Sequence, residues 1–220
     1  ASNNVAVGYS SLSANTTGAQ NTAVGSIAGD ALTVGSNNTV FGYGALSSDT
    51  QGSKNTAIGS AALFAQNFTS ATNVYNTAVG DSAGAAVTTG TSNTLIGGLS
   101  GDAITTGAGN TAVGLGSLSA TTTANFNTAV GYQALLLNTT AANNTALGSQ
   151  SLAVNTTGTQ NTSVGAAALD ANTTANNNTA VGYAALTTNT TGHSGVAVGK
   201  DALAANTTGN YNVAVGVDAL

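Results

Sequence analysis

Few residues of this chain could carry out acid–base, nucleophilic or metal chemistry. The only histidine is His193, Lys54 and Lys200 are the only cations, seven aspartates are the only acids, and cysteine is absent. Catalysis needs several such groups to converge, whereas His193 lies in a Gly-His-Ser-Gly segment that is typical of an exposed turn. We therefore expect no enzyme activity, no catalytic residue, no metal site and no cofactor.

Neither the glycine pattern at Gly114 nor the distribution of the aspartates matches a complete ligand-binding motif. Gly114-x-Gly116 resembles part of a phosphate-binding loop, but it lacks the lysine and the following helix. The seven aspartates occupy different repeat positions and do not form the Gly-Gly-x-Gly-x-Asp pattern of calcium-binding β-rolls. We interpret Gly114 and Gly116 as corners of a repeated coil.

The composition excludes two classes of partner. Charged residues make up 4% of the chain and the formal net charge is −5, so there is no basic stripe that could neutralise nucleic-acid phosphates. The apolar residues are dispersed, and none of their runs approaches the roughly 18 residues that cross a bilayer. We expect neither nucleic-acid binding nor membrane insertion.

An Asn-Thr-Thr segment recurs at one position of the sequence and has two interpretations. Each copy is an Asn-x-Thr acceptor for N-linked glycans, and each could also form a turn in which Asn and Thr bond to nearby backbone groups. The turn is the favoured interpretation, and the glycan row remains the alternative. The asparagines are Asn15, Asn138, Asn155, Asn172, Asn189 and Asn206.

These segments belong to a repeat that runs through the whole chain and is marked by a recurring glycine. Eleven of the twelve intervals between these glycines are 17 residues, and the interval from Gly59 to Gly80 is 21, which indicates a four-residue insertion. Such regularity predicts a repeating structural unit. The glycines are Gly8, Gly25, Gly42, Gly59, Gly80, Gly97, Gly114, Gly131, Gly148, Gly165, Gly182, Gly199 and Gly216.

Positions counted from the glycine show distinct preferences. Asn stands four residues before it in twelve of thirteen copies, and a large apolar residue stands immediately before it in all thirteen. Two residues before that apolar residue stands Thr or Val, which shares its face of a strand. We expect both columns to face the core.

Two kinds of coil are predicted from the position four residues after the glycine. Ten copies have Leu there, whereas Gly29, Gly84 and Gly101 are followed three residues later by Leu32, Val87 and Ile104. We expect the two kinds to fill one core differently. A second small residue, often Gly, stands ten residues after the repeat glycine, and we expect both glycines to mark corners with positive φ.

The pattern favours an all-β parallel β-solenoid of about thirteen 17-residue coils, with residues 1–220 as a single domain. Thr, Asn and Gly dominate and no helical spacing of apolar residues occurs. Proline is absent, as required where every strand must donate its N–H groups to the next coil. We expect the coils to stack in register into a rod.

A single roll of this kind has few large apolar residues per coil, and this favours a homo-oligomer, with three chains as the first expectation. The chain begins and ends within a repeat, so we also expect a segment of a longer fibre or a subunit that stacks end to end. Four tyrosines that follow the repeat glycine are expected at a seam between chains. They are Tyr9, Tyr43, Tyr132 and Tyr183.

The Asn-Thr-Ala-Val-Gly motif, as in Asn21–Gly25 and Asn127–Gly131, resembles the YadA-type head repeats of trimeric autotransporter adhesins. Gly131–Leu135 and Asn155–Gly158 look like repeats of phage and marine-virus tail fibres. The resemblance covers the whole chain, although the coil is longer than in the adhesin heads. It implies a left-handed β-roll that trimerises.

The resemblance implies an extracellular fibre or adhesin shaft, on a virion or a cell surface, that binds a host receptor or glycan. Aromatic residues near the insertion, Phe64, Phe68 and Tyr75, are candidates for partner contact. One alternative is a self-assembling, glycosylated extracellular filament. The other is an ice-binding solenoid, against which stands the expected inward orientation of the most regular Thr column.

Overall fold

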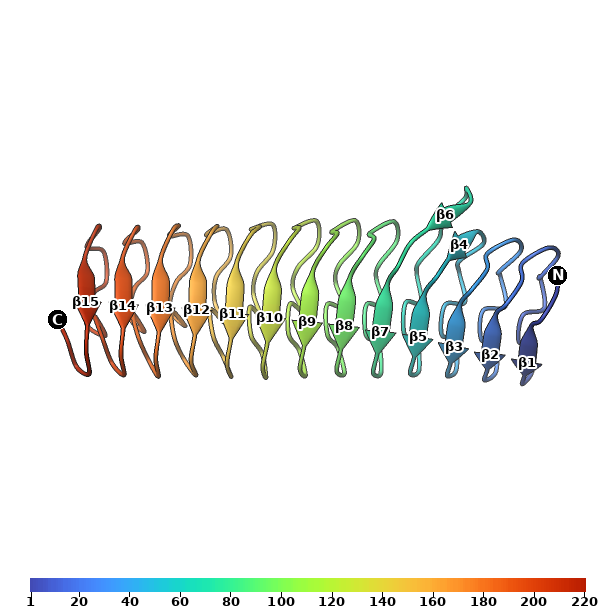
Figure 1. Cartoon of the computed structure of the whole chain (residues 1–220), viewed down its shortest axis with the longest axis horizontal. Coiled ribbons are helices and arrows are strands. Elements are labelled where there is room, and N and C mark those ends of the chain that lie inside the picture. The colour runs from blue at the N-terminus through green and yellow to red at the C-terminus, as the bar shows by residue number, and fades with distance from the viewer. The chain divides into compact units, whose positions relative to one another are not determined.

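The computed structural model describes residues 1–220 and contains short β-strands and turns but no helix. The chain divides into two compact units, unit 1 (Ala1–Asn110) and unit 2 (Thr111–Leu220). Each unit is a parallel β-solenoid in which one short strand recurs once per turn (Figure 1). The all-β parallel solenoid with 17-residue spacing is confirmed, and the 13 strand copies correspond to about twelve turns.

Unit 1 contains six strands of the main ladder and one additional pair. The ladder strands, in their order in the sheet, are β1 (Val5–Val7), β2 (Thr22–Val24), β3 (Thr39–Phe41), β5 (Thr56–Ile58), β7 (Thr77–Val79) and β8 (Thr94–Ile96). The additional pair is formed by β4 (Gly52–Ser53) and β6 (Thr72–Asn73), which also run parallel.

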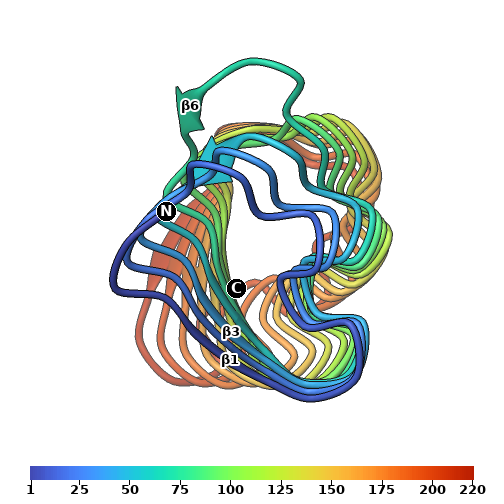
Figure 2. The same ribbon diagram turned by 90° about the vertical axis from the view of Figure 1, so that its right-hand side faces the viewer.

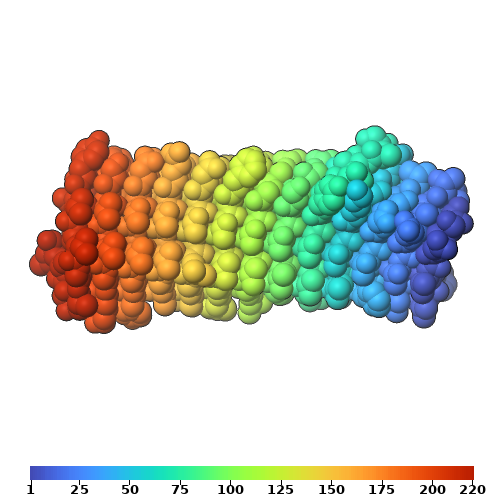
Figure 3. Space-filling view, in the orientation of Figure 1, coloured from blue at the N-terminus to red at the C-terminus, as the bar shows by residue number.

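Unit 2 contains seven strands in sequence order and no insertion. They are β9 (Thr111–Val113), β10 (Thr128–Val130), β11 (Thr145–Leu147), β12 (Thr162–Val164), β13 (Thr179–Val181), β14 (Val196–Val198) and β15 (Val213–Val215). Within each unit the side chains of successive turns touch along the visible face (Figure 3).

The strand register reproduces the sequence repeat. Thr128 pairs with Thr145 and Thr145 with Thr162, which are steps of 17 residues. Across the insertion the register is Thr56 to Thr77, so the four extra residues leave the ladder unshifted. They are accommodated by the segment that carries β6, which projects beyond the outline of the neighbouring turns (Figure 2).

The orientation predicted for the strand side chains is wrong. The middle residue of the strand is the one that points inward: Ala23, Ala57 and Ala129, for example, are fully buried. The Thr before it and the aliphatic residue after it are half-buried or exposed. The interior is narrow, and it is occupied by alanine at most of these middle positions. The Thr column therefore faces outward, which removes the objection to an ice-binding surface.

The core is completed by the Leu that follows the repeat glycine by four residues, and the two predicted kinds of coil are confirmed. Leu46, Leu63 and Leu135 are fully buried, and where Gly replaces Leu the buried residue is Leu32, Val87 or Ile104. The buried side chain of Leu95 explains why two of these turns have Gly in place of Leu. A Cβ on Gly84 or on Gly101 would lie 2.7 Å from a Leu95 methyl group, so both turns lack a side chain where Leu95 needs space.

The two recurrent glycine positions require a small residue for different physical reasons. The repeat glycine has φ between +128° and +141°, as predicted. The glycine ten residues later, such as Gly90 or Gly158, does not have positive φ, so this part of the prediction is wrong. Its position needs a small residue because the backbone of the next turn lies close by. Alanine also occurs there, as in Ala141 and Ala175.

Candidate interaction surfaces

Each unit presents an uncharged face made of the outward-pointing first and third residues of its strands, which we call the sheet face. The first residue is Thr or Val and the third is Val, Ile, Leu or Phe. In unit 1, Phe41, Ile58 and Ile96 are exposed, and in unit 2 the side chain of Leu147 is 46% exposed. The face thus combines a row of hydroxyl groups with a row of apolar side chains, in which the internal valines are half-buried and Phe41, Ile58, Ile96 and Leu147 are exposed.

Exposed tyrosines follow the sheet face at the position after the repeat glycine. Tyr9 and Tyr43 in unit 1, and Tyr132 and Tyr183 in unit 2, all have exposed side chains. They extend the apolar surface beyond the strands at these turns. Their predicted place at a seam between chains stays a prediction.

Inside each unit, the Asn that stands four residues before the repeat glycine forms a ladder of buried amides. The Nδ2 of Asn144 donates to the carbonyl oxygen of Gly158 at 2.8 Å, and its Oδ1 accepts from the backbone N–H of Asn161 at 2.9 Å. In unit 1, Asn21 and Asn38 are joined in the same way. Each Asn therefore connects its own turn with the next.

Five of the six candidate glycan acceptors form a second ladder in unit 2, from Asn138 to Asn206. Asn155 Nδ2 donates to the carbonyl oxygen of Gly158 at 2.9 Å and to Oδ1 of Asn138 at 3.1 Å. Asn138, Asn155, Asn172 and Asn189 are fully buried, whereas Asn15 and Asn206 are half-buried. A glycan on a buried Nδ2 has no room in the folded unit, so the geometry supports the turn interpretation at these four positions.

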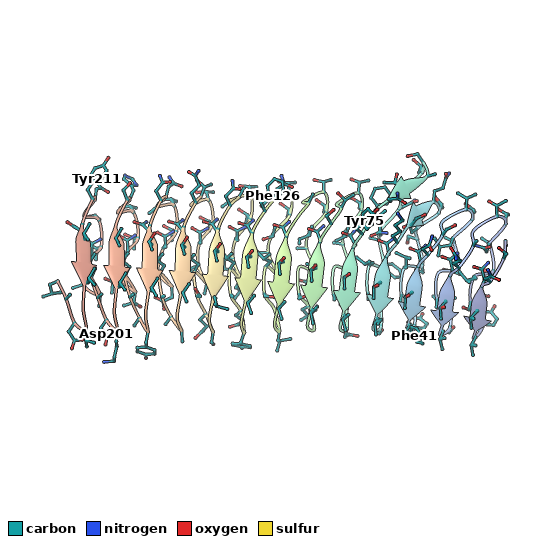
Figure 4. All side chains as sticks on the ribbon, viewed as in Figure 1. Phe41, Tyr75, Phe126, Asp201 and Tyr211 are labelled. Carbon is teal, nitrogen blue, oxygen red and sulfur yellow. The ribbon has the colours of Figure 1, made fainter.

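The three aromatic residues near the insertion do not form one surface. Phe68 is only 9% exposed, and its N–H donates to Oδ1 of Asp49 at 3.0 Å. Phe64 is 45% exposed and Tyr75 is 53% exposed. Tyr75 lies on the edge of unit 1 from which β6 projects, and Phe41 lies on the opposite edge (Figure 4). Phe68 thus anchors the insertion, and only Phe64 and Tyr75 are available to a partner.

The base of the insertion contains a buried polar chain that the sequence did not reveal. Asp49 is fully buried, and its Oδ2 accepts from Nε2 of Gln66 at 2.6 Å. Gln66 Oε1 in turn accepts from Nδ2 of Asn76 at 2.8 Å. Asp49 and Gln66 stand at the position that Asn15 occupies in the first turn, and Leu32 before them and Val87 after them isolate this pair from the second ladder.

The few cations lie on the surface. The Lys54 ammonium donates to the Tyr75 hydroxyl at 3.0 Å and lies 5.0 Å from the centre of its ring. Lys200 Nζ lies 2.7 Å from Oδ2 of Asp201. This hydrogen bond, together with the attraction of the carboxylate, raises the pKa of Lys200 above its ordinary value.

The side chains that could perform chemistry are dispersed. His193 is exposed, in the turn where the sequence predicts it, and its backbone N–H donates to Oδ1 of Asn210 at 2.8 Å. The structure contains no group of three His, Cys, Asp or Glu residues that could hold a metal ion, and it contains no pocket. The features available for interaction are therefore extended surfaces.

The fold and these surfaces define a repeat protein of the parallel β-solenoid class. A scan of protein-family models and searches of curated proteins and of solved structures found no match to the chain. The structure has no helix that is long and apolar enough to span a membrane.

Proposed function

We propose that this protein is a structural module of an extracellular fibre or adhesin shaft, on a virion or a cell surface, that works as a homo-oligomer. Its role is to provide reach, stiffness and attachment to a host receptor or glycan. The resemblance of the repeat to YadA-type heads and viral tail fibres supports a left-handed roll and three chains as the first expectation.

The observation that carries this proposal is the sheet face. A row of half-buried valines with exposed Ile, Leu and Phe side chains on a regular sheet is a larger apolar surface than isolated exposed residues would give, and such surfaces mark sites of association. The face carries no charge, so a strongly charged partner gains nothing there.

A second copy of the chain is the partner that fits this face best. Neighbouring strands of a sheet lie about 4.8 Å apart, so the aliphatic side chains recur at that spacing along each unit. Another copy has the same spacing and can match every turn with a turn of its own. Association would then bury Val130, Leu147 and Val164 together with their counterparts, and the hydrophobic gain would add turn by turn.

Charges placed on the sheet face are expected to separate the chains. In the variant Leu147→Lys/Val164→Lys, two ammonium groups would have to be buried in the interface without partners, which costs several kcal/mol for each ion. We expect the wild-type protein to have the mass of an oligomer by light scattering coupled to size-exclusion chromatography, and the variant to have the mass of one chain.

The matched control is Asn143→Lys/Gln160→Lys, which adds the same charge to exposed positions of the same turns away from the strands. Lys54 occupies the equivalent position in unit 1, so lysine is compatible with the fold there. This control should keep the wild-type mass. A wild-type protein that is monomeric at all concentrations, or a loss of mass in the control alone, would contradict the proposal.

A further inference from the structure

Unit 2 carries a second regular array of hydroxyl groups, on the bends that follow the buried Leu column. Two consecutive threonines occur there in six successive turns, and we call this array the Thr edge. The pairs are Thr122–Thr123, Thr139–Thr140, Thr156–Thr157, Thr173–Thr174, Thr190–Thr191 and Thr207–Thr208.

In five of the six pairs the hydroxyl group of the first threonine donates to the turn next to it. Thr139 Oγ1 donates to the carbonyl oxygen of Thr156 at 3.1 Å, Thr156 Oγ1 to that of Thr173 at 3.0 Å, and Thr190 Oγ1 to that of Thr207 at 3.1 Å. These bonds restrain the first threonines in the same way from turn to turn. This row of the Thr edge is therefore ordered before any ligand arrives.

The second threonine of each pair faces solvent. Thr140, Thr157, Thr174 and Thr191 are exposed, and their hydroxyl groups make no hydrogen bond within the chain. Each therefore offers one donor and two acceptor lone pairs to water, next to a methyl group. No Asp or Lys lies within two residues of any pair, so no strongly hydrated charge disturbs the water along the edge.

We propose that the Thr edge of unit 2 binds ice. Turns repeat at about 4.8 Å, a distance comparable to that between second-neighbour oxygen atoms in ice. Hydroxyl groups at this spacing can hold water in an ordered layer, while the methyl groups restrict its other arrangements. Each contact is weak, but six rows acting together make release slow, as in multivalent binding.

The pattern is more regular here than elsewhere in the chain. In unit 1 the pair occurs in three of six turns, as Thr16-Thr17, Thr88-Thr89 and Thr105-Thr106, and the other three turns hold Thr33-Val34, Thr50-Gln51 and Asn67-Phe68. On the sheet face, the Thr row is accompanied by aliphatic residues of several sizes, which suits contact with protein. The Thr edge combines a constant residue type, a bonded first threonine in five of its six turns and an exposed second threonine in every turn, and so it is the surface best suited to a crystal lattice of water.

The test uses the full-length chain. Wild-type protein should show thermal hysteresis and shape ice crystals. In the variant Thr140→Lys/Thr157→Lys/Thr174→Lys the thermal hysteresis should be lower by roughly ten-fold or more. The three replaced hydroxyl groups have no partner in the chain, so the circular dichroism spectrum and melting temperature should stay the same.

The matched control, Asn143→Lys/Gln160→Lys/Asn177→Lys, adds three lysines to exposed positions of the same turns and should keep full activity. Leu147→Lys/Val164→Lys should also keep it, because the sheet face is a different surface. The inference is overturned by a wild-type protein without hysteresis or ice shaping, or by equal losses of hysteresis in the Thr-edge variant and its control. It is also overturned if the wild-type protein binds crystalline cellulose, another regular hydroxyl-bearing surface, but does not bind ice. None of these results depends on the oligomeric state.

Discussion

Replacing Gly148 with alanine should disrupt the turns on either side of it. The residue has φ +139°, and a Cβ there would lie 2.5 Å from the carbonyl oxygen of Gly165. Both atoms of this clash are fixed by the backbone ladder, so neither side can move without breaking strand pairing. Backbone strain alone costs about 1–3 kcal/mol, and with the clash we expect about 4 kcal/mol or more. Hydrogen exchange should show lost protection around Gly148–Gly165.

The matched control for this variant is Gly116→Ala. Gly116 also has positive φ, at +66°, but a Cβ there would meet only side-chain atoms, the nearest at 3.7 Å. Gln133 and Ala167 occupy the equivalent position in other turns with similar φ. We expect Gly116→Ala to leave the protection pattern unchanged. Equal effects of the two substitutions would show that the close approach of the turns is not what requires glycine.

The second large effect is expected from Asn144→Leu, which keeps the number and branching of the side-chain heavy atoms and removes the polar ones. The N–H of Asn161 would lose its partner inside the unit, whereas the carbonyl oxygen of Gly158 would lose one of its two donors and keep Asn155 Nδ2. An unsatisfied buried group costs about 1–3 kcal/mol and a lost hydrogen bond about 0.5–1.5 kcal/mol, so the free energy of unfolding should fall by about 2–4 kcal/mol. Urea denaturation followed by circular dichroism measures this change.

Gly195 provides the reciprocal experiment, because it is the one copy of this position that lacks Asn. Its backbone N–H still donates to Oδ1 of Asn178 at 2.8 Å, and a Cβ would lie no closer than 3.2 Å to any neighbour. Gly195→Asn should continue the ladder and stabilise the chain by about 1 kcal/mol. A stabilising Asn144→Leu together with a destabilising Gly195→Asn would refute the role of the ladder.

The spacing of residues predicted the register of the fold but not which face of the strand is buried. Alternation with period two places Thr128 and Val130 on one side and Ala129 on the other. It does not say which side is inside, and the larger apolar residue suggested the wrong one. The interior is narrow and is shared with Leu135 from another part of the turn, so a small residue such as Ala129 suits most middle positions, and Val40 and Leu95 are the larger exceptions.

Backbone conformation set a second limit on prediction. Leu135, Leu152 and Leu169 have φ between +50° and +52°, a region that residues with a Cβ seldom adopt. No sequence signal marks this, because the same Leu column would be expected in an ordinary strand or turn. The polar chain at Asp49 was missed for a related reason: a single Asp in a Thr-rich segment gives no sign that it replaces a buried Asn.

The Asn-Thr-Thr segments show how one pattern can serve two purposes in the structure. The Asn, as in Asn155, points inward and joins turns, whereas Thr157 points outward and is free to contact water. The sequence pattern allowed a turn or a glycan on the Asn and favoured the turn. In the structure the Asn is buried, and the threonines that follow it are the residues available at the surface.

The central claim is that turns of 17 residues stack in parallel register. Disulfide trapping tests this claim directly because the chain has no cysteine. Thr128 and Thr145 are register partners on β10 and β11, about 4.8 Å apart and thus within reach of a disulfide. Oxidation of Thr128→Cys/Thr145→Cys should give nearly complete intrachain cross-linking. Thr128→Cys/Thr162→Cys, two turns apart, should give almost none. Efficient cross-linking of the second pair, or none in the first, would contradict the stacked solenoid.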